Sequence, residues 1–299
     1  MNDLSADLFG NCPGHGGQQI HLASPIDFDG FRHAAWHLIA RGTPPEQVAW
    51  VTANSAKPQA LTLEIAPAIK VGADFMSLCK TVILHSDPAR FELLYRLLWR
   101  MAREPRLQYD PLDADMLKTE HLAKAVRRDM HKMKAFVRFR TVADEAFKAL
   151  PTSGPLHVAW FEPEHHIVEA TAHFFARRFT QMRWAILTPE RCMAWNGAVV
   201  CFSPGAQKCA APPPDAGEAL WLTYYQNTFN PARLKLKMMQ KEMPRRYWHN
   251  LPEAELITTM AANANQRQTR MIEEQPTMPR RRIPVFNKNA QTERSQLLI

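Results

Sequence analysis

The sequence predicts an α+β fold that is rich in helix, with a central mixed sheet and a C-terminal helical subdomain. Several long segments repeat apolar residues every three or four positions, as in 91–101, where arginines occupy the other side. Short apolar segments separate them, and residues 156–189 have the pattern of a strand, a helix and a second strand. With 299 residues, 46% of them hydrophobic and 22% charged, the chain can bury a sizeable core.

The first half predicts two strands and four helices. Strand-like segments cover 19–24 and 46–53, and between them Asp27 or Asp29 can cap a helix that ends near Arg41. A second helix covers 73–86, and a third begins at Asp87-Pro88, because proline suits a first helical turn. A long fourth helix is expected over 113–135.

The second half mixes strands and helices. Strands are expected near 137, over 156–163 and over 182–189, and a hairpin over 191–205 turns at Asn196-Gly197. The helix over 164–181 should bury Ile167, Ala170, Phe174 and Phe175. Helices follow over 219–229, 230–243 and 252–274. We expect one central sheet built from the strands near 20, 48, 137, 158, 185 and 198.

Composition shifts suggest how the chain is organised. Residues 1–18 are polar and are expected to form a mobile tail, and 276–299 to form a basic mobile tail or the remnant of a linker. Between them, 19–275 is expected to form a single α+β domain, in which 216–275 is a possible C-terminal helical subdomain that follows a proline-rich connector.

Several functional classes find no support in the sequence. The five cysteines are odd in number and lack CxxC spacing, which argues against a disulfide framework or an iron–sulfur cluster. There is no glycine-rich phosphate loop, no nucleophile elbow, no signal peptide and no apolar stretch long enough to span a membrane. We therefore expect a cytoplasmic protein that binds no membrane and carries no cofactor.

The most unusual segment is "VRRDMHKMKAFVRFR", residues 126–140, where Asp129 is the only acid among many bases. In a helix, Ala123, Val126, Met130, Met133 and Val137 share one stripe and should pack in the core. The bases would then cover the surface, and phosphate groups, plain solvent or an acidic protein could each face them. The candidate nucleic-acid contacts here are Lys124, Arg127, Arg128, His131, Lys132, Lys134 and Arg138.

A second basic cluster lies near the C-terminus and fits the net charge of +8. Tyr224, Tyr225, Phe229, Tyr247 and Trp248 flank it, and aromatic residues beside cations can stack on unpaired bases, although such spacing is also typical of a core. The candidate contacts here are Arg233, Lys235, Lys237, Arg245 and Arg246.

The densest titratable cluster lies within 162–173. His166, Glu169 and His173 would share one face of a helix and are the candidate catalytic residues, as a general base or around a metal. The HExxH spacing is absent, so no metal ligands are assigned, and a half-buried polar face is the alternative.

Taken together, five segments resemble a bacterial family described as DNA repair or DNA metabolism proteins of unknown biochemical activity. They are "DFDGFRHAAWHLIARGTPPEQVAW", "LLYRLLWRMARE", "VRRDMHKMKAFVRFR", "HHIVEATAHFFARRFTQMRWAILTP" and "NPARLKLKMMQKEMPRRYWHNLPEA". The resemblance covers roughly residues 20–275.

The resemblance implies an accessory role on DNA. Some members of that family are joined to a uracil-DNA glycosylase-like domain, and others accompany a radical-SAM protein thought to act on DNA. This chain lacks the water-activating loop and the base-recognition motif of a glycosylase, so we expect a partner to supply any such activity. A hydrolase acting on DNA through 162–173, or a module that docks a protein and never touches DNA, are the alternatives.

Overall fold

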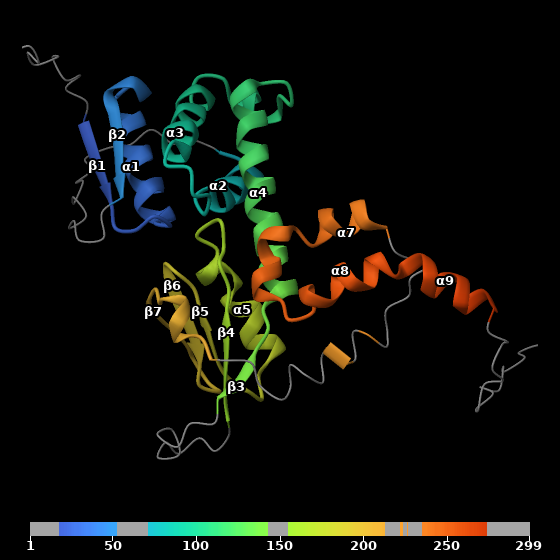
Figure 1. Ribbon diagram of the computed structural model, residues 1–299. Coiled ribbons are helices and arrows are strands. Elements are labelled where there is room, and N and C mark those ends of the chain that lie inside the picture. The colour runs from blue at the N-terminus through green and yellow to red at the C-terminus, as the bar shows by residue number, and fades with distance from the viewer. Residues whose placement is uncertain are drawn as a thin grey trace, which may run out of the picture.

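The computed structural model describes residues 18–52, 71–142, 155–212, 222–223, 226 and 235–273 (Figure 1). The tail expected over 1–18 lies outside the described residues except for Gln18, which begins a strand, and the tail expected over 276–299 and nearly all of the helix expected over 219–229 also lie outside them. The described residues form an α+β fold with a mixed five-stranded sheet and several helices, as predicted.

An N-terminal lobe contains strands β1 (Gln18–Leu22) and β2 (Val48–Thr52) and helices α1 (Phe28–Ala40), α2 (Ala73–Val82) and α3 (Arg90–Met101). Asp27 is the N-cap of α1 and accepts a hydrogen bond from the Gly30 backbone N–H at 2.8 Å. Among the described residues, β1 and β2 pair in parallel with each other alone, so their predicted place in one central sheet is wrong. Apolar side chains of all three helices fill this lobe's own core.

A second lobe contains the five-stranded sheet. Its strands are β3 (Arg140–Val142), β4 (Leu156–Trp160), β5 (Arg183–Leu187), β6 (Arg191–Trp195) and β7 (Val200–Pro204), in that spatial order. β4 and β5 are parallel neighbours, and helix α5 (Val168–Arg178) connects them in the chain. The other neighbouring strands of the sheet are antiparallel. Gly197 turns the β6–β7 hairpin with φ of 101°, which confirms the turn expected at Asn196-Gly197.

The start of α5 differs from the prediction. The helix begins at Val168 rather than at residue 164, and its buried side is formed by Val168, Thr171, Ala172 and Phe175. Ile167 and Phe175 are buried as expected, but Ala170 and Phe174 are exposed. The later start of α5 has a physical cause, because the backbone N–H groups of Glu164 and His165 donate to Asp129 and are held outside the helix.

The C-terminal segment is helical and packs on the second lobe. It contains α7 (Leu236–Glu242), a 3₁₀ helix (Arg245–Asn250), α8 (Ala254–Ala262) and α9 (Ala264–Glu273). Tyr247, Leu251, Ala254 and Ile257 join the core of the second lobe. None of the helices in the described part of the chain is long and apolar enough to cross a membrane.

Helix α4 (Ala114–Phe136) runs through both lobes (Figure 1). Its N-cap is Asp113, close to the predicted start, and the helix ends within one residue of the predicted end. Leu122 and Ala123 belong to the core of the N-terminal lobe, whereas Val126 and Met133 belong to the core of the second lobe. Helix α4 therefore contributes side chains to both cores, and its C-terminal half carries the basic segment.

Candidate nucleic-acid interface

The C-terminal half of α4 has three distinct faces, because successive residues are rotated by about 100°. Ala123, Val126 and Met133 are buried in the cores, and Met130 and Val137 are half-buried against the second one, as predicted. A second face, formed by Asp129, Lys132 and Phe136, meets the C-terminal segment. The third face points outward and carries Lys124, Arg127, Arg128, His131 and Lys134, all exposed; we call these five residues the α4 stripe.

Asp129 is removed from the surface by its hydrogen bonds. Its carboxylate is 1% exposed and accepts backbone N–H groups of Glu164 at 2.8 Å and His165 at 3.0 Å. The Tyr247 hydroxyl donates to the other oxygen at 3.1 Å. Burial raises the pKa of Asp129 to about 6, although the His165 N–H, the Tyr247 hydroxyl and Arg246 act in the opposite direction. The one acid of residues 121–142 therefore does not neutralise the α4 stripe.

Lys132 is also buried, and this corrects its predicted place on the contact surface. The side chain is 4% exposed, and its ammonium donates to the backbone carbonyl of Glu242 and lies 3.4 Å from that residue's carboxylate. Phe136 lies against the same ammonium, 5.7 Å from ring centre to Nζ. Lys132 holds the end of α7 against α4, and its charge is therefore not part of the α4 stripe.

Few contacts restrain the α4 stripe. Arg127 lies 3.7 Å from Glu120, with both side chains 54% exposed, a geometry that stabilises little. Within the described residues, Lys124, Arg128 and His131 form no ion pair. Arg138 differs, because its guanidinium donates to the buried Glu253 carboxylate at 2.8 Å and to two backbone carbonyls. We therefore place Arg138 among the residues that hold the C-terminal segment.

The second predicted cluster is divided by the structure. Lys235 and Lys237 are exposed on α7, together with Lys241. Arg245 is exposed and lies over the Trp248 ring, whereas Arg246 pairs with Glu164 and donates to the Tyr247 hydroxyl at 3.0 Å. Arg233 and the aromatic residues Tyr224, Tyr225 and Phe229 lie outside the described residues. Tyr247 is buried, so it belongs to the core rather than to a stacking surface.

The structure adds α5 to this interface. Helix α5 packs against α4, and its outward face carries His173, Phe174, Arg177 and Arg178, all exposed. Lys134 of the α4 stripe lies over the Phe174 ring, 5.1 Å from its centre, so the two exposed faces are continuous. The sequence analysis had assigned Ala170 and Phe174 to the buried face of this helix, which is instead formed by Val168, Thr171, Ala172 and Phe175.

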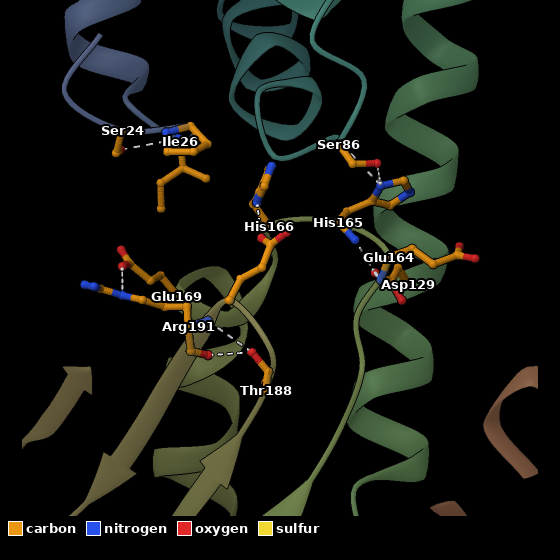
Figure 2. A network of polar contacts seen from close by, with 12 residues as sticks. Ser24, Ile26, Ser86, Asp129, Glu164, His165, His166, Glu169, Thr188 and Arg191 are labelled. Atoms are coloured by element: carbon orange, nitrogen blue, oxygen red, sulfur yellow. Dashed lines mark hydrogen bonds and ion pairs between the residues drawn. The ribbon is translucent and has the colours of Figure 1, made fainter. Parts of the chain in front are cut away.

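The predicted catalytic trio is not brought together. His166 lies before α5 and its Nδ1 is 2.8 Å from Glu190, whereas Glu169 pairs with Arg191 at 2.9 Å (Figure 2). His173 is exposed on the outward face of α5. Glu162 accepts from the Trp160 indole at 2.7 Å and faces His249 at 3.4 Å. No group of three or more histidine, cysteine or acidic side chains among the described residues could hold a metal ion.

A pair of histidines joins the two lobes beside Asp129. His165 accepts at Nδ1 from the backbone N–H of Ser86 at 3.3 Å (Figure 2). Its ring lies 4.1 Å from that of His85. Burial lowers the pKa of His85 to about 4, helped by the nearby His165, and burial likewise lowers the pKa of His165. Both rings are therefore neutral near pH 7. They pack against each other, and the hydrogen bond from Ser86 to His165 links the two lobes.

The fold and this surface define a two-lobed α+β protein with a cationic helical face. Residues 88–253 match the family described as a domain of unknown function, DUF4130. The match covers more than half of the chain, and the protein belongs to this family. The matched range contains α4, α5, the five-stranded sheet and α7, and hence the whole interface. Searches of the curated proteins and of the solved structures found no match.

Proposed function

We propose that this protein binds the phosphate backbone of nucleic acid, DNA in the first instance, as an accessory in DNA repair or DNA metabolism. The observation that carries the proposal is the α4 stripe: four exposed lysine and arginine side chains and His131 on one helix face, with the only acid of residues 121–142 buried. Surfaces without such a partner usually intersperse both signs of charge.

The spacing of the α4 stripe suits a phosphate chain. Arg127 and Arg128 are adjacent, and the other steps along the stripe are three residues, about 4.5 Å along the helix axis. From Lys124 to Lys134 the stripe is about 15 Å long, which matches roughly four phosphates of one strand at their axial spacing of about 3.4 Å. Contacts from lysine and arginine to phosphates position a protein on the backbone and carry no sequence information.

The resemblance to DNA repair or DNA metabolism proteins that suggests DNA as the ligand also suggests protein partners. A uracil-DNA glycosylase-like protein or a radical-SAM protein would carry out the chemistry, and this chain would hold the substrate. We place this work in the cytoplasm. The buried anchors of the basic segment support the accessory role, because they fix the cations on a rigid helix rather than on a loop.

The test is a salt titration of DNA binding by fluorescence anisotropy. The affinity of the wild type should fall with a slope of about −3 to −4 in log K against log salt. The double variant Lys124→Gln with Arg128→Gln should lower the affinity about tenfold or more at low salt and make the slope shallower by about two.

A matched control removes two charges elsewhere. Arg106→Gln with Lys118→Gln changes the net charge equally, and both side chains are exposed outside the α4 stripe. This control should bind within twofold of the wild type. If micromolar wild-type protein binds no DNA at low salt, the proposal is wrong and an acidic protein is the better candidate for this surface.

A further inference from the structure

An exposed aromatic ring lies beside the α4 stripe. Phe174 on α5 is 37% exposed, although its neighbour Phe175 is buried in the core of the second lobe. The two rings meet edge to face at 5.2 Å, so Phe175 supports the ring of Phe174 from below. Lys134 lies 5.1 Å from the centre of the Phe174 ring.

The charges around Phe174 are positive. Arg177 and Arg178 share the exposed part of α5 with it and with the imidazole of His173, and Lys134 reaches it from α4. Glu169 is the only acid in 168–178, and it is paired with Arg191 at 2.9 Å. A flat apolar ring framed by cations suits a ligand that joins an aromatic face to an anionic chain.

Other aromatic side chains near the α4 stripe already have partners. Tyr247 is buried and stacks on Phe161 at 5.5 Å. Trp248 is half-buried and donates its indole N–H to the Met243 carbonyl at 2.9 Å. Phe139 is half-buried and meets Phe179 edge to face at 5.2 Å. Phe174 is thus the ring that this surface offers to a ligand within the described residues.

We infer that Phe174 stacks on an unpaired base and that the ligand of this surface is single-stranded nucleic acid. The inference rests on the proposed function, because the α4 stripe must hold the phosphates for the ring to meet a base. A duplex keeps its bases stacked on one another, so only an unpaired or extruded base can offer its face to Phe174. The contact requires no particular base, since every base has such a face.

The experiment compares three probes of equal length: a single-stranded oligothymidylate, the same strand with a central run of abasic sites, and a duplex. Phe174→Leu keeps an apolar side chain of similar size and removes the ring. It should weaken binding of the oligothymidylate about fivefold to a hundredfold and leave binding of the abasic strand and the duplex within twofold. The salt slope should not change, because no charge is lost.

Phe202→Leu is the matched control. Phe202 on β7 is also 37% exposed and has Arg191 over its ring at 5.6 Å, but it lies on the sheet rather than beside the α4 stripe. This variant should bind all three probes as the wild type does. A melting temperature within a few degrees of the wild type shows that each variant is folded.

The outcomes separate this inference from the proposed function. If the wild type binds none of the probes at low salt, the proposed function fails. If the wild type binds with a steep salt dependence and Phe174→Leu binds oligothymidylate equally well, the stacking inference is wrong and the proposed function stands. Equal losses for oligothymidylate and for the abasic strand would also overturn the inference, because they would show that no base is being contacted.

Discussion

At the scale of single residues, Asp129 organises the junction between the basic helix and its surroundings. Its carboxylate receives three hydrogen bonds from two segments that are distant in the sequence. It therefore fixes both the loop that precedes α5 and the 3₁₀ helix Arg245–Asn250 against α4. Because burial raises its pKa to about 6, the ionised form is costly near neutral pH, and the hydrogen bonds offset part of that cost.

Replacing Asp129 tests this arrangement through pH. The folded protein holds the proton up to about pH 6, whereas the unfolded chain releases it near pH 4. This group alone therefore makes the free energy of unfolding fall as pH rises from about 4 to about 6. The difference in free energy of unfolding between wild type and Asp129→Asn should fall over the same range, as measured by urea denaturation at several pH values.

Asp129→Ala is a useful companion variant. It leaves the N–H groups of Glu164 and His165 without their acceptor, at a cost of about 1–3 kcal/mol for each buried group. It should therefore be much less stable than Asp129→Asn at pH 7. Equal stability of the two variants would show that these hydrogen bonds do not form.

Lys132 and Lys134 are close in sequence but should respond very differently to charge reversal. Lys132→Glu would bury a carboxylate beside the carboxylate of Glu242 and should lower the free energy of unfolding by more than about 3 kcal/mol. Lys134→Glu changes an exposed residue and should stay within about 0.5 kcal/mol. Urea denaturation measures both, and similar effects would contradict the burial of Lys132.

The sequence could reveal which residues are basic but not which of them are buried. The apolar stripe of Ala123, Val126 and Met133 follows from helical spacing alone. The burial of Asp129 and Lys132 depends on Glu164, Tyr247 and Glu242, and no local pattern connects these partners. The pairing of Arg138 with Glu253 could not be predicted for the same reason, since the two residues are distant in sequence.

At the scale of elements, the start of α4 is fixed by a capping network. Asp113 accepts backbone N–H groups of Asp115 and Met116, each at 3.0 Å, and pairs with Arg100 of α3 at 2.6 Å. Asp115 pairs in turn with Arg96 at 2.6 Å. The hydrogen bond from Arg100 holds the pKa of Asp113 below its usual range, as the one from Arg96 does for Asp115.

Asp113→Ala should therefore destabilise the protein in a pH-dependent way. At pH 7 the loss of the cap should lower the free energy of unfolding by about 1–2 kcal/mol. A lowered pKa means that the carboxylate stabilises the fold above about pH 4 and that this contribution is lost as pH falls through the lowered pKa. Urea denaturation at pH 7 and at pH 3 should show a smaller difference from the wild type at the lower pH; an unchanged difference would contradict this account.

Most elements could be predicted from the sequence because their signals are local. The cap at Asp27, the start of α4 near residue 113, the turn at Gly197 and the strand–helix–strand order of the second lobe depend on near neighbours. The start of α5 could not be predicted, because Asp129 holds the preceding backbone. The pairing of β1 with β2 apart from the larger sheet is likewise a matter of long-range packing.

At the scale of the whole molecule, α4 is the axis that connects the two lobes and presents the charges. Lys134 of the α4 stripe contacts Phe174 of α5, and Lys132 on the neighbouring face of α4 contacts Glu242 at the end of α7. The resulting cationic surface draws on residues of α4 and α5 that are far apart in the sequence. Long-range attraction of an anionic chain is the expected consequence.

The most direct measurement is the salt dependence of DNA affinity for the wild type, for Lys124→Gln with Arg128→Gln, and for Arg106→Gln with Lys118→Gln. We predict that the slope of log K against log salt is shallower by about two for the first double variant than for the wild type. The second double variant should have the slope of the wild type. Equal slopes for all three proteins, or no DNA binding by the wild type at low salt, would contradict the assignment of the α4 stripe as a phosphate-binding surface.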